Sequence, residues 1–253
     1  MVTHSAQAAQ IEAYDAMAPL YAEYSGRYCA YLDAVDQLVI DRLKPGIRLL
    51  DLGSGDGRRL HKIAAHHGLT DVVAVEPSSA MAALCRKTTG FAVHQLFGDE
   101  LDRLPQTGFD AITVLWNVFG HMADSSVRLK TLGLLKAKLA PGGTIMLDVN
   151  NRHNRRAYGR WTVFRRRLID ALAFDDKRGD VHYQWQIGNQ SLPSSGHLFT
   201  PAEMAGLFRR AGLGVAERLS VNYASGAVCD SPLDGQLFFL LQDGNSGRAG
   251  LRG

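Results

Sequence analysis

Three carboxylate side chains recur at nearly even spacing in the first hundred residues. Asp51 closes an apolar run in LLDLGSGDG, Glu76 closes DVVAVE, and Asp99 lies in FGDELDRLP. A carboxylate can accept hydrogen bonds from two neighbouring hydroxyls or from an amino group, and it attracts a cation. The three positions therefore indicate a site for an adenosine-containing ligand that carries positive charge and no phosphate.

The glycines after Asp51 sharpen this prediction. Gly53 and Gly55 allow a ligand to approach the backbone closely, and a helix that follows would offer its free N–H groups. A dinucleotide site needs the pattern GxGxxG, but Gly57 comes one position early and Arg58 fills the slot of the last glycine. A carboxylate beside a phosphate would also repel it. The turn thus argues against a dinucleotide-dependent oxidoreductase.

Short apolar runs and helical patterns alternate around these residues. The predicted strands of the first part are Arg48–Leu52, Val72–Glu76, Ala92–Leu96, Ala111–Trp116 and Thr144–Val149. The predicted helices between them are Arg58–His67, Ser79–Lys87 and Ser125–Leu139. Nearly continuous apolar strands are typical of parallel sheets that are covered on both faces. We therefore expect a doubly wound α/β sheet, in which the carboxyl ends of the strands share one edge.

The last third of the chain closes this sheet. Thr200, Pro201 and Glu203 form a helix-start signature with a capping box. Two more strands follow, at 214–222 and 236–242, in addition to the five before. The prediction is a mostly parallel, seven-stranded Rossmann-like sheet with an insertion at 150–198, before the last helix.

Composition sets limits on the class of protein. The chain has 253 residues, a formal net charge of +3 and three scattered cysteines, Cys29, Cys85 and Cys229. No cysteine spacing suits a disulfide framework or zinc, and no metal site is expected. The absence of a signal peptide or membrane span predicts a cytoplasmic protein. We expect one domain over 1–243 and a flexible tail at 244–253.

Five segments resemble, in order and spacing, the motifs of class I S-adenosylmethionine-dependent methyltransferases. These segments are LLDLGSGDG, VVAVEPSSAMAALCR, FGDELDRLP, FDAITVLWNVFGHM and LKAKLAPGGTIMLDV. The resemblance covers about residues 10–150 and implies S-adenosylmethionine as the cofactor. It divides the domain into covering helices (10–45), a cofactor-binding core (46–149), a substrate-side insertion (150–198) and a closing helix with strands (199–243).

The resemblance also implies roles for single residues. Asp51, Gly53 and Gly55 would line the methionine moiety, and Glu76 would hold the ribose. Met81 would pack on the adenine, Asp99 would accept from its amine, and Trp116 and Asn117 would meet the amino-acid end. Tyr14 and Tyr21 are seven residues apart, which predicts one face of a single helix covering the cofactor.

Methyl transfer from a sulfonium is an in-line displacement, which a general base assists when the acceptor carries a proton. His121 and His153 are the candidates for that base, and His121 is also a candidate substrate contact. Tyr183 and Trp185 are expected to wall the acceptor pocket.

A basic stretch lies in the insertion, with seven arginines and no acid from Arg152 to Arg167. It is compatible with a lid whose charges are solvated, with a rim that attracts an anionic small molecule, with docking to tRNA and with an anionic membrane surface. The rim interpretation assigns Arg155 and Arg156 to the substrate. The low net charge and the lack of an RNA-binding motif argue against nucleic acid as a partner.

The sequence therefore predicts an enzyme that methylates a nitrogen or oxygen of a small anionic or aromatic metabolite. The alternatives are a tRNA-modifying methyltransferase and a catalytically silent S-adenosylmethionine-binding regulatory protein. The identity of the acceptor and the oligomeric state stay open.

Overall fold

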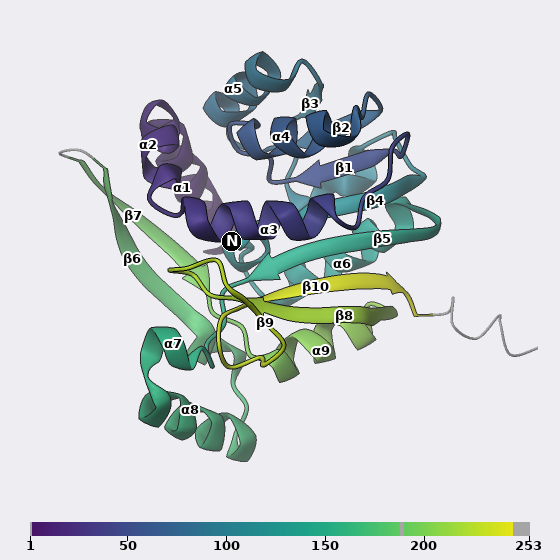
Figure 1. The fold of residues 1–253 in the computed structure, drawn as a ribbon. Coiled ribbons are helices and arrows are strands. Elements are labelled where there is room, and N and C mark those ends of the chain that lie inside the picture. The colour runs from purple at the N-terminus through teal and green to yellow at the C-terminus, as the bar shows by residue number, and fades with distance from the viewer. Residues whose placement is uncertain (1, 188–189, 245–253) are drawn as a thin grey trace, which may run out of the picture.

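A twisted sheet of eight strands, in the order β3-β2-β1-β4-β5-β10-β8-β9, forms the centre of the molecule (Figure 1). The computed structural model describes residues 2–187 and 190–244. The strands of this sheet are β1 (Leu49–Leu52), β2 (Val72–Val75), β3 (Ala92–His94), β4 (Phe109–Val114), β5 (Leu139–Val149), β8 (Leu213–Val221), β9 (Val228–Cys229) and β10 (Gln236–Asp243). The first five are parallel to one another, and β10 is antiparallel to β5 and β8. The doubly wound, mostly parallel Rossmann-like sheet is confirmed, with the two-residue β9 as an additional strand.

Helices cover both faces of the sheet because successive strand residues point to opposite sides. Leu49 and Ala74 pack with helices α3, α4 and α5, whereas Leu50 and Val73 pack with the cluster of α6 and α9. The bounds of these helices are α3 (Cys29–Ile40), α4 (Arg58–His67), α5 (Ser79–Thr89), α6 (Ser125–Lys138) and α9 (Pro201–Arg210). Strands buried on both faces explain the continuous apolar runs.

Strand β5 begins earlier than predicted. Thr144 was the expected first residue, but Leu139 already pairs with Phe109 before the register shifts. The Pro141–Gly142–Gly143 segment is thus an irregular part of the strand, and no separate turn precedes it. Gly142, at φ +80°, bends the chain where an L residue would be strained.

The sequence predicted a single helix that carries both Tyr14 and Tyr21, but the N-terminal region is divided into separate helices. Helix α1 (Val2–Met17) ends before the short 3₁₀ helix η1 (Ala18–Leu20), and α2 (Tyr21–Gly26) follows. Pro19 lies at this break, where it lacks the N–H that a continuous helix would need. Asp15 fixes α1 to the core, because its Oδ1 accepts from Ser78 Oγ at 2.5 Å and from the backbone N–H of Ala80 at 2.9 Å.

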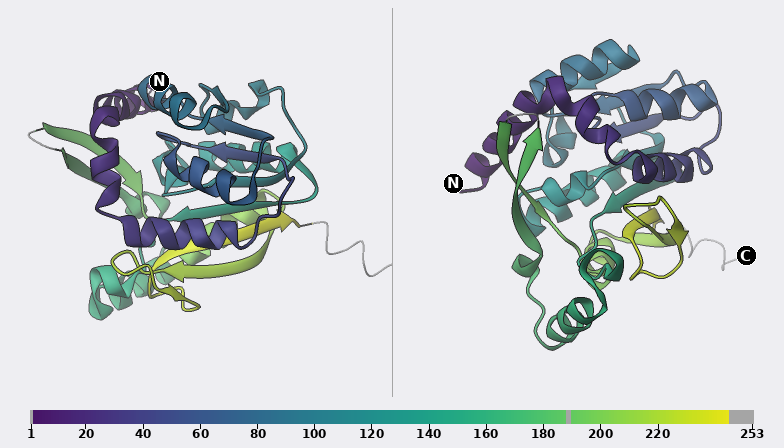
Figure 2. Two further views of the ribbon diagram at one scale, coloured as in Figure 1. Left: turned by 45° about the horizontal axis from the view of Figure 1, so that its top comes forward. Right: turned by 60° about the vertical axis from the view of Figure 1, so that its left-hand side comes forward.

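The insertion consists of two helices and a separate hairpin. The helices are α7 (Arg155–Tyr158) and α8 (Arg160–Leu172), and the short 3₁₀ helix η4 (Asp176–Gly179) leads into the hairpin of β6 (Asp180–Ile187) and β7 (Gln190–His197). Figure 2 shows this hairpin running away from the sheet and beside α1. Trp185 of the hairpin is buried against Ala13 and Met17 of α1. The insertion therefore closes over the same side of the molecule as the N-terminal helices.

Two further predictions concern a C-terminal tail and the absence of a membrane span. The predicted tail, 244–253, lies outside the described residues except for Gly244. Among the residues that the structure describes, no helix is long and apolar enough to cross a membrane.

The capping box of α9 is present as predicted, with Glu203 N–H donating to Thr200 Oγ1 at 3.1 Å and Thr200 N–H donating to the Glu203 carboxylate. We expect Thr200→Ala to lower the free energy of unfolding by about 1 kcal/mol, because the N–H of Glu203 loses its acceptor, Thr200 Oγ1. Urea denaturation measures the change. Thr162→Ala, at an exposed position in the first turn of α8 (Arg160–Leu172), is the control and should leave stability within about 0.5 kcal/mol. Equal losses in the two variants would contradict the capping role.

Candidate active site

A cleft of about 540 Å³ opens at the carboxyl edge of β1, β2 and β4, between the N-terminal helices and the hairpin. Asp51, Glu76 and Asp99 all line it, so the three carboxylates predicted from the sequence converge in one place. Other predicted residues also line the cleft, namely Tyr14, Tyr21, Gly53, Gly55, Trp116, Asn117, His121, Tyr183 and Trp185. Ligands bind at this edge of open α/β sheets.

The glycine turn follows β1 with a left-handed backbone. Gly53 and Gly55 have φ angles of +78° and +56°, which an L residue rarely adopts. A Cβ on Gly53 would lie 2.4 Å from Val118 Cγ2, so this position has no room for a side chain. A Cβ on Gly55 would face the hydroxyl of Tyr21 at 3.4 Å. The turn therefore forms a narrow floor that leaves the cleft free for a ligand.

Glu76 connects this turn to the next crossover. Its Oε2 accepts from the N–H of Gly55 at 2.8 Å, and its Oε1 accepts from the N–H of Ser78 at 2.9 Å. Burial raises the pKa of the Glu76 carboxyl to about 7, although the two backbone donors favour the charged form. Each oxygen keeps a further lone pair for a ligand hydroxyl.

Asp51 lies deeper at the end of β1. Its Oδ1 accepts from Thr113 Oγ1 at 2.6 Å, and desolvation raises the pKa of its carboxyl. A buried carboxylate of this kind gains stability from a cation, so the base of the cleft suits a positively charged group. Asp99 lines the cleft from the 3₁₀ helix η2 (Gly98–Arg103).

The turn after β4 is strained. Trp116 and Asn117 have φ angles of 62° and 59°, which is uncommon for residues other than glycine. The Trp116 N–H donates to Asp148 Oδ1 at 2.5 Å, and the Tyr31 hydroxyl donates to the other oxygen of that carboxylate. Asn117 Oδ1 accepts from the N–H of Asn150 at 2.9 Å. These bonds hold a backbone conformation of the kind that clusters at functional sites.

Aromatic side chains form the wall on the hairpin side of the cleft, and Trp185 of the hairpin is one of them. Tyr14 meets Trp185 edge-on with ring centroids 4.9 Å apart, and Tyr24 stacks on Trp116 at 5.9 Å. The Trp116 indole N–H donates to the Tyr223 hydroxyl at 2.9 Å. Tyr24 and Tyr223 were not predicted from the sequence. The recurrence of tyrosine at three- and four-residue steps in YAEYSGRYCAY is the signal that could have revealed Tyr24.

His121 lies in the cleft between α1 and β7. Its Nδ1 is 3.0 Å from the carbonyl oxygen of Ser195 and 2.6 Å from the side-chain nitrogen of Gln10. Desolvation lowers the pKa of His121 to about 4, so the imidazole is neutral at pH 7. The Ser195 carbonyl only accepts and the Gln10 amide nitrogen only donates, so the first contact needs a protonated Nδ1 and the second an unprotonated one. In the tautomer that donates to Ser195, Nε2 is the nitrogen that can accept a proton.

Four predicted residues lie elsewhere. Met81, which the resemblance would place on the adenine, is fully buried in α5 and is not among the described residues that line the cleft. His153 Nε2 contacts Asp170 Oδ2 at 2.8 Å under α8, also outside the cleft. Its environment suits a structural contact.

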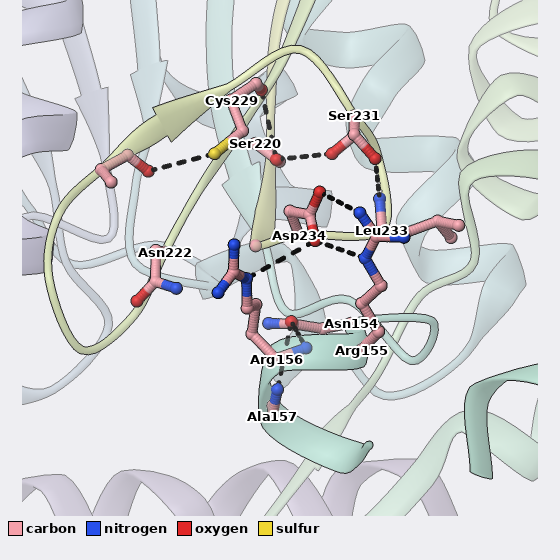
Figure 3. Close-up of polar contacts among 12 residues, drawn as sticks. Asn154, Arg155, Arg156, Ala157, Ser220, Asn222, Cys229, Ser231, Leu233 and Asp234 are labelled. Carbon is pink, nitrogen blue, oxygen red and sulfur yellow. Dashed lines mark hydrogen bonds and ion pairs between the residues drawn. The ribbon is translucent and has the colours of Figure 1, made fainter. Parts of the chain in front are cut away.

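Arg155 and Arg156 are the other two. Figure 3 shows both guanidinium groups directed to Asp234, in the loop before β10, with N–O distances of 2.5 and 3.6 Å. Asn154 caps α7 through the N–H groups of Arg156 and Ala157, which sets the direction of this first turn. The two arginines are absent from the described lining of the cleft and pair with a carboxylate far away in sequence.

Arg59 is a residue of the cleft to which the sequence reasoning gave no binding role. It lies in the first turn of α4, and its Nε donates to Asp36 Oδ1 at 2.7 Å. Its buried Nη2 has no hydrogen-bond partner among the described residues. A buried guanidinium nitrogen in this condition can bind an anionic ligand group such as a carboxylate. The donors and acceptors of the cleft thus fit a ligand with hydroxyl, amino, cationic and carboxylate groups.

In the described part of the chain, no group of three or more His, Cys, Asp or Glu side chains is placed so that it could hold a metal ion.

Comparisons with known proteins agree with this geometry. A family model described as a methyltransferase domain matches residues 21–217. The CcbJ methyltransferase from Streptomyces caelestis is 17% identical with a TM-score of 0.66, and the match covers 90% of this chain and 96% of that one. A complex of DhpI with SAM and HEP is 21% identical with a TM-score of 0.65, and the match covers 94% and 98%.

The sugar N-methyltransferase KedS8 from Streptoalloteichus sp ATCC 53650 is 21% identical with a TM-score of 0.55, and the match covers 85% and 90%. Identities at this level show a shared fold. No curated protein matches the chain.

The buried Glu76 carboxyl provides a test of the site. We expect its carboxyl carbon to titrate with a pKa of about 7 in the free protein, because desolvation outweighs the two backbone donors. Carbon-13 NMR of glutamate-labelled protein measures this value, and Glu76→Gln identifies the signal by its loss. Since the native state holds this proton more tightly than the unfolded chain, ionisation of Glu76 lowers stability as pH rises through 7. A signal that titrates near the ordinary value of a glutamate would contradict the burial of this group.

Proposed function

Because the chain belongs to the methyltransferase family whose domain model matches residues 21–217, we propose that it methylates a nitrogen or oxygen of a small aromatic metabolite. The cofactor is S-adenosylmethionine, and the chain is an enzyme of this class. One observation carries the proposal for the acceptor. A single cleft joins the converging carboxylates on its sheet side to a wall of tyrosine and tryptophan on its hairpin side.

The cofactor would be held by the sheet side. Glu76 would accept hydrogen bonds from the ribose hydroxyls, and Asp99 would accept one from the adenine amine. The glycine turn and Asp51 would surround the cationic amino-acid end, while Arg59 Nη2 would bind its carboxylate. Bound there, S-adenosylmethionine supplies a methyl group on a positively charged sulfur.

The acceptor would be held by the aromatic wall. Tyr14, Tyr183 and Trp185 offer ring faces and edges for stacking a flat molecule, and they exclude water from the reaction. A ring face also stabilises a nearby cation, so these residues favour the charge that arises on a methylated amine.

Charge argues for an aromatic rather than an anionic acceptor. Among the described residues that line the cleft, the arginine and lysine side chains are Arg58, Arg59 and Lys62, all from α4. Each forms an ion pair with an aspartate of its surroundings. The hairpin side therefore has no described cation for an acidic metabolite, and Arg155 and Arg156 pair with Asp234 outside the described lining. The sugar N-methyltransferase among the similar structures supports a small-molecule acceptor.

His121 would act on the proton of the acceptor. In the tautomer whose Nδ1 donates to the carbonyl of Ser195, its neutral imidazole would receive a proton at Nε2. Because its pKa is about 4, the ring would hold that proton only briefly and pass it to water. This role suits a hydroxyl or an aromatic amine, whose proton becomes acidic as the new bond forms.

Transfer of label tests the proposed activity. The purified protein is incubated with S-adenosylmethionine labelled in the methyl group and with separate RNA, lipid and small-molecule fractions of a host extract. We expect label in aromatic small molecules, together with release of S-adenosylhomocysteine. Label in RNA would favour a tRNA-modifying enzyme, and binding without any turnover would favour a silent regulatory protein; each result would overturn the proposal.

Trp185→Ala tests the aromatic wall. We expect the concentration of the active extract fraction needed for half-maximal rate to rise roughly tenfold, since one aromatic contact of an acceptor is lost. The affinity for S-adenosylmethionine should stay within about twofold. Trp161→Ala removes an exposed tryptophan of α8 and is the matched control, with no change in either value. An unchanged acceptor requirement in Trp185→Ala would remove the hairpin from acceptor binding.

A further inference from the structure

Helix α8 presents large apolar side chains to solvent. Trp161, Phe164, Leu168 and Leu172 are 82%, 60%, 52% and 79% exposed. Their spacing places them on one face of the helix, and we call these four residues the α8 stripe. Contiguous apolar surface of this kind on a protein marks a site of contact with a partner or a membrane.

The opposite face of α8 fixes the helix to the rest of the protein. Val163 is 3% exposed, and Asp170 accepts from Arg152 and contacts His153. Arg166 stacks over the ring of Tyr158 at 4.3 Å. Because these residues occupy the inner side, the α8 stripe points away from the body. Figure 1 shows α8 at the periphery, apart from the central sheet, and the views in Figure 2 agree.

Arginines border the α8 stripe on both sides. At about 100° per residue, Arg160 and Arg167 fall on one flank and Arg165 on the other, and all three are exposed. The single acid of α8, Asp170, is turned inward to His153 and Arg152. The outer surface of the helix is thus apolar along its centre and positive along its edges.

We propose that α8 lies on an anionic lipid surface, with the α8 stripe in the boundary of the acyl chains and the arginines at the headgroups. A basic helix with tryptophan, phenylalanine and leucine on one face has the composition of interfacial helices. Arginines near such a surface add electrostatic attraction, which a Debye length of about 8 Å at physiological salt confines to close contact. This binding does not depend on the proposed function of the cleft.

A second copy of the chain fits this surface less well. A helix of 13 residues is about 20 Å long, and its outer face offers only a few hundred Å². A standard interface needs about 800 Å² from each partner. Two copies paired through the α8 stripe would also bring their bordering arginines together, and like charges oppose association.

Sedimentation with vesicles tests the proposal. The full-length protein is mixed with vesicles of phosphatidylcholine alone, or with one quarter phosphatidylserine, at low and high salt. We expect binding to the anionic vesicles at least tenfold stronger than to the neutral ones, and a loss of most of it in about 0.5 M NaCl. No binding to anionic vesicles, or equal binding to both kinds, would overturn the proposal.

Two matched double variants locate the contact. Leu168→Glu with Leu172→Glu should reduce the bound fraction at least tenfold, because two acids replace half of the stripe. Val215→Glu with Val228→Glu places the same acids at two half-exposed valines of β8 and β9, and it should bind as the unchanged protein does. Circular dichroism confirms that both variants are folded. Equal binding by the two variants would contradict a role of α8, as would a dimer of the unchanged protein that the leucine variant alone abolishes.

Discussion

A buried carboxylate, that of Glu76, holds together the two loops that shape the cleft. Its oxygens accept from Gly55 on the turn after β1 and from Ser78 at the start of α5. Burial of a charge is costly unless hydrogen bonds compensate it, and here the compensation comes from backbone groups whose positions depend on the sheet. The pKa of the Glu76 carboxyl is raised because desolvation outweighs these hydrogen bonds. A ligand with hydroxyl groups adds further donors and so stabilises the ionised form that the free protein holds only weakly.

The second constraint is the cover over this floor. Asp15 fixes α1 to α5, and Trp185 of the hairpin packs on α1. Segments 170 residues apart in the sequence thus form one aromatic wall. The strained turn at Trp116 and Asn117 brings the sheet edge against the same wall. Since Trp185 belongs to the hairpin and the three carboxylates belong to the sheet side, we expect a change in the hairpin to alter the aromatic wall more than the sheet side.

Much of the fold was predictable because local patterns determine it. The helix predicted at Arg58–His67 matches α4 at both ends, and the carboxylates converge because parallel strands end at one edge. Strand β7 was missed because QSLPSSGH has polar residues, a proline and a glycine in place of an alternating apolar pattern. The break before α2 depends on Pro19, which the spacing of the two tyrosines concealed.

The sequence predicted which acidic side chains line the cleft, but it did not predict which arginines do. Arg155 and Arg156 looked like a rim for substrate, but their partner Asp234 lies about eighty residues further along the chain, and only the tertiary structure brings them together. The reverse holds for Arg59, to which the sequence analysis gave no role and which lies in the cleft with a nitrogen that has no partner among the described residues.

The account depends most on the kind of ligand that the cleft accepts, and titration calorimetry at pH 8 measures this directly. At that pH Glu76 is mostly ionised, given its pKa of about 7. We predict that S-adenosylmethionine binds at one site per chain and that NADH releases no heat of binding. Binding of NADH, with no binding of S-adenosylmethionine, would contradict the assignment of the glycine turn and the three carboxylates.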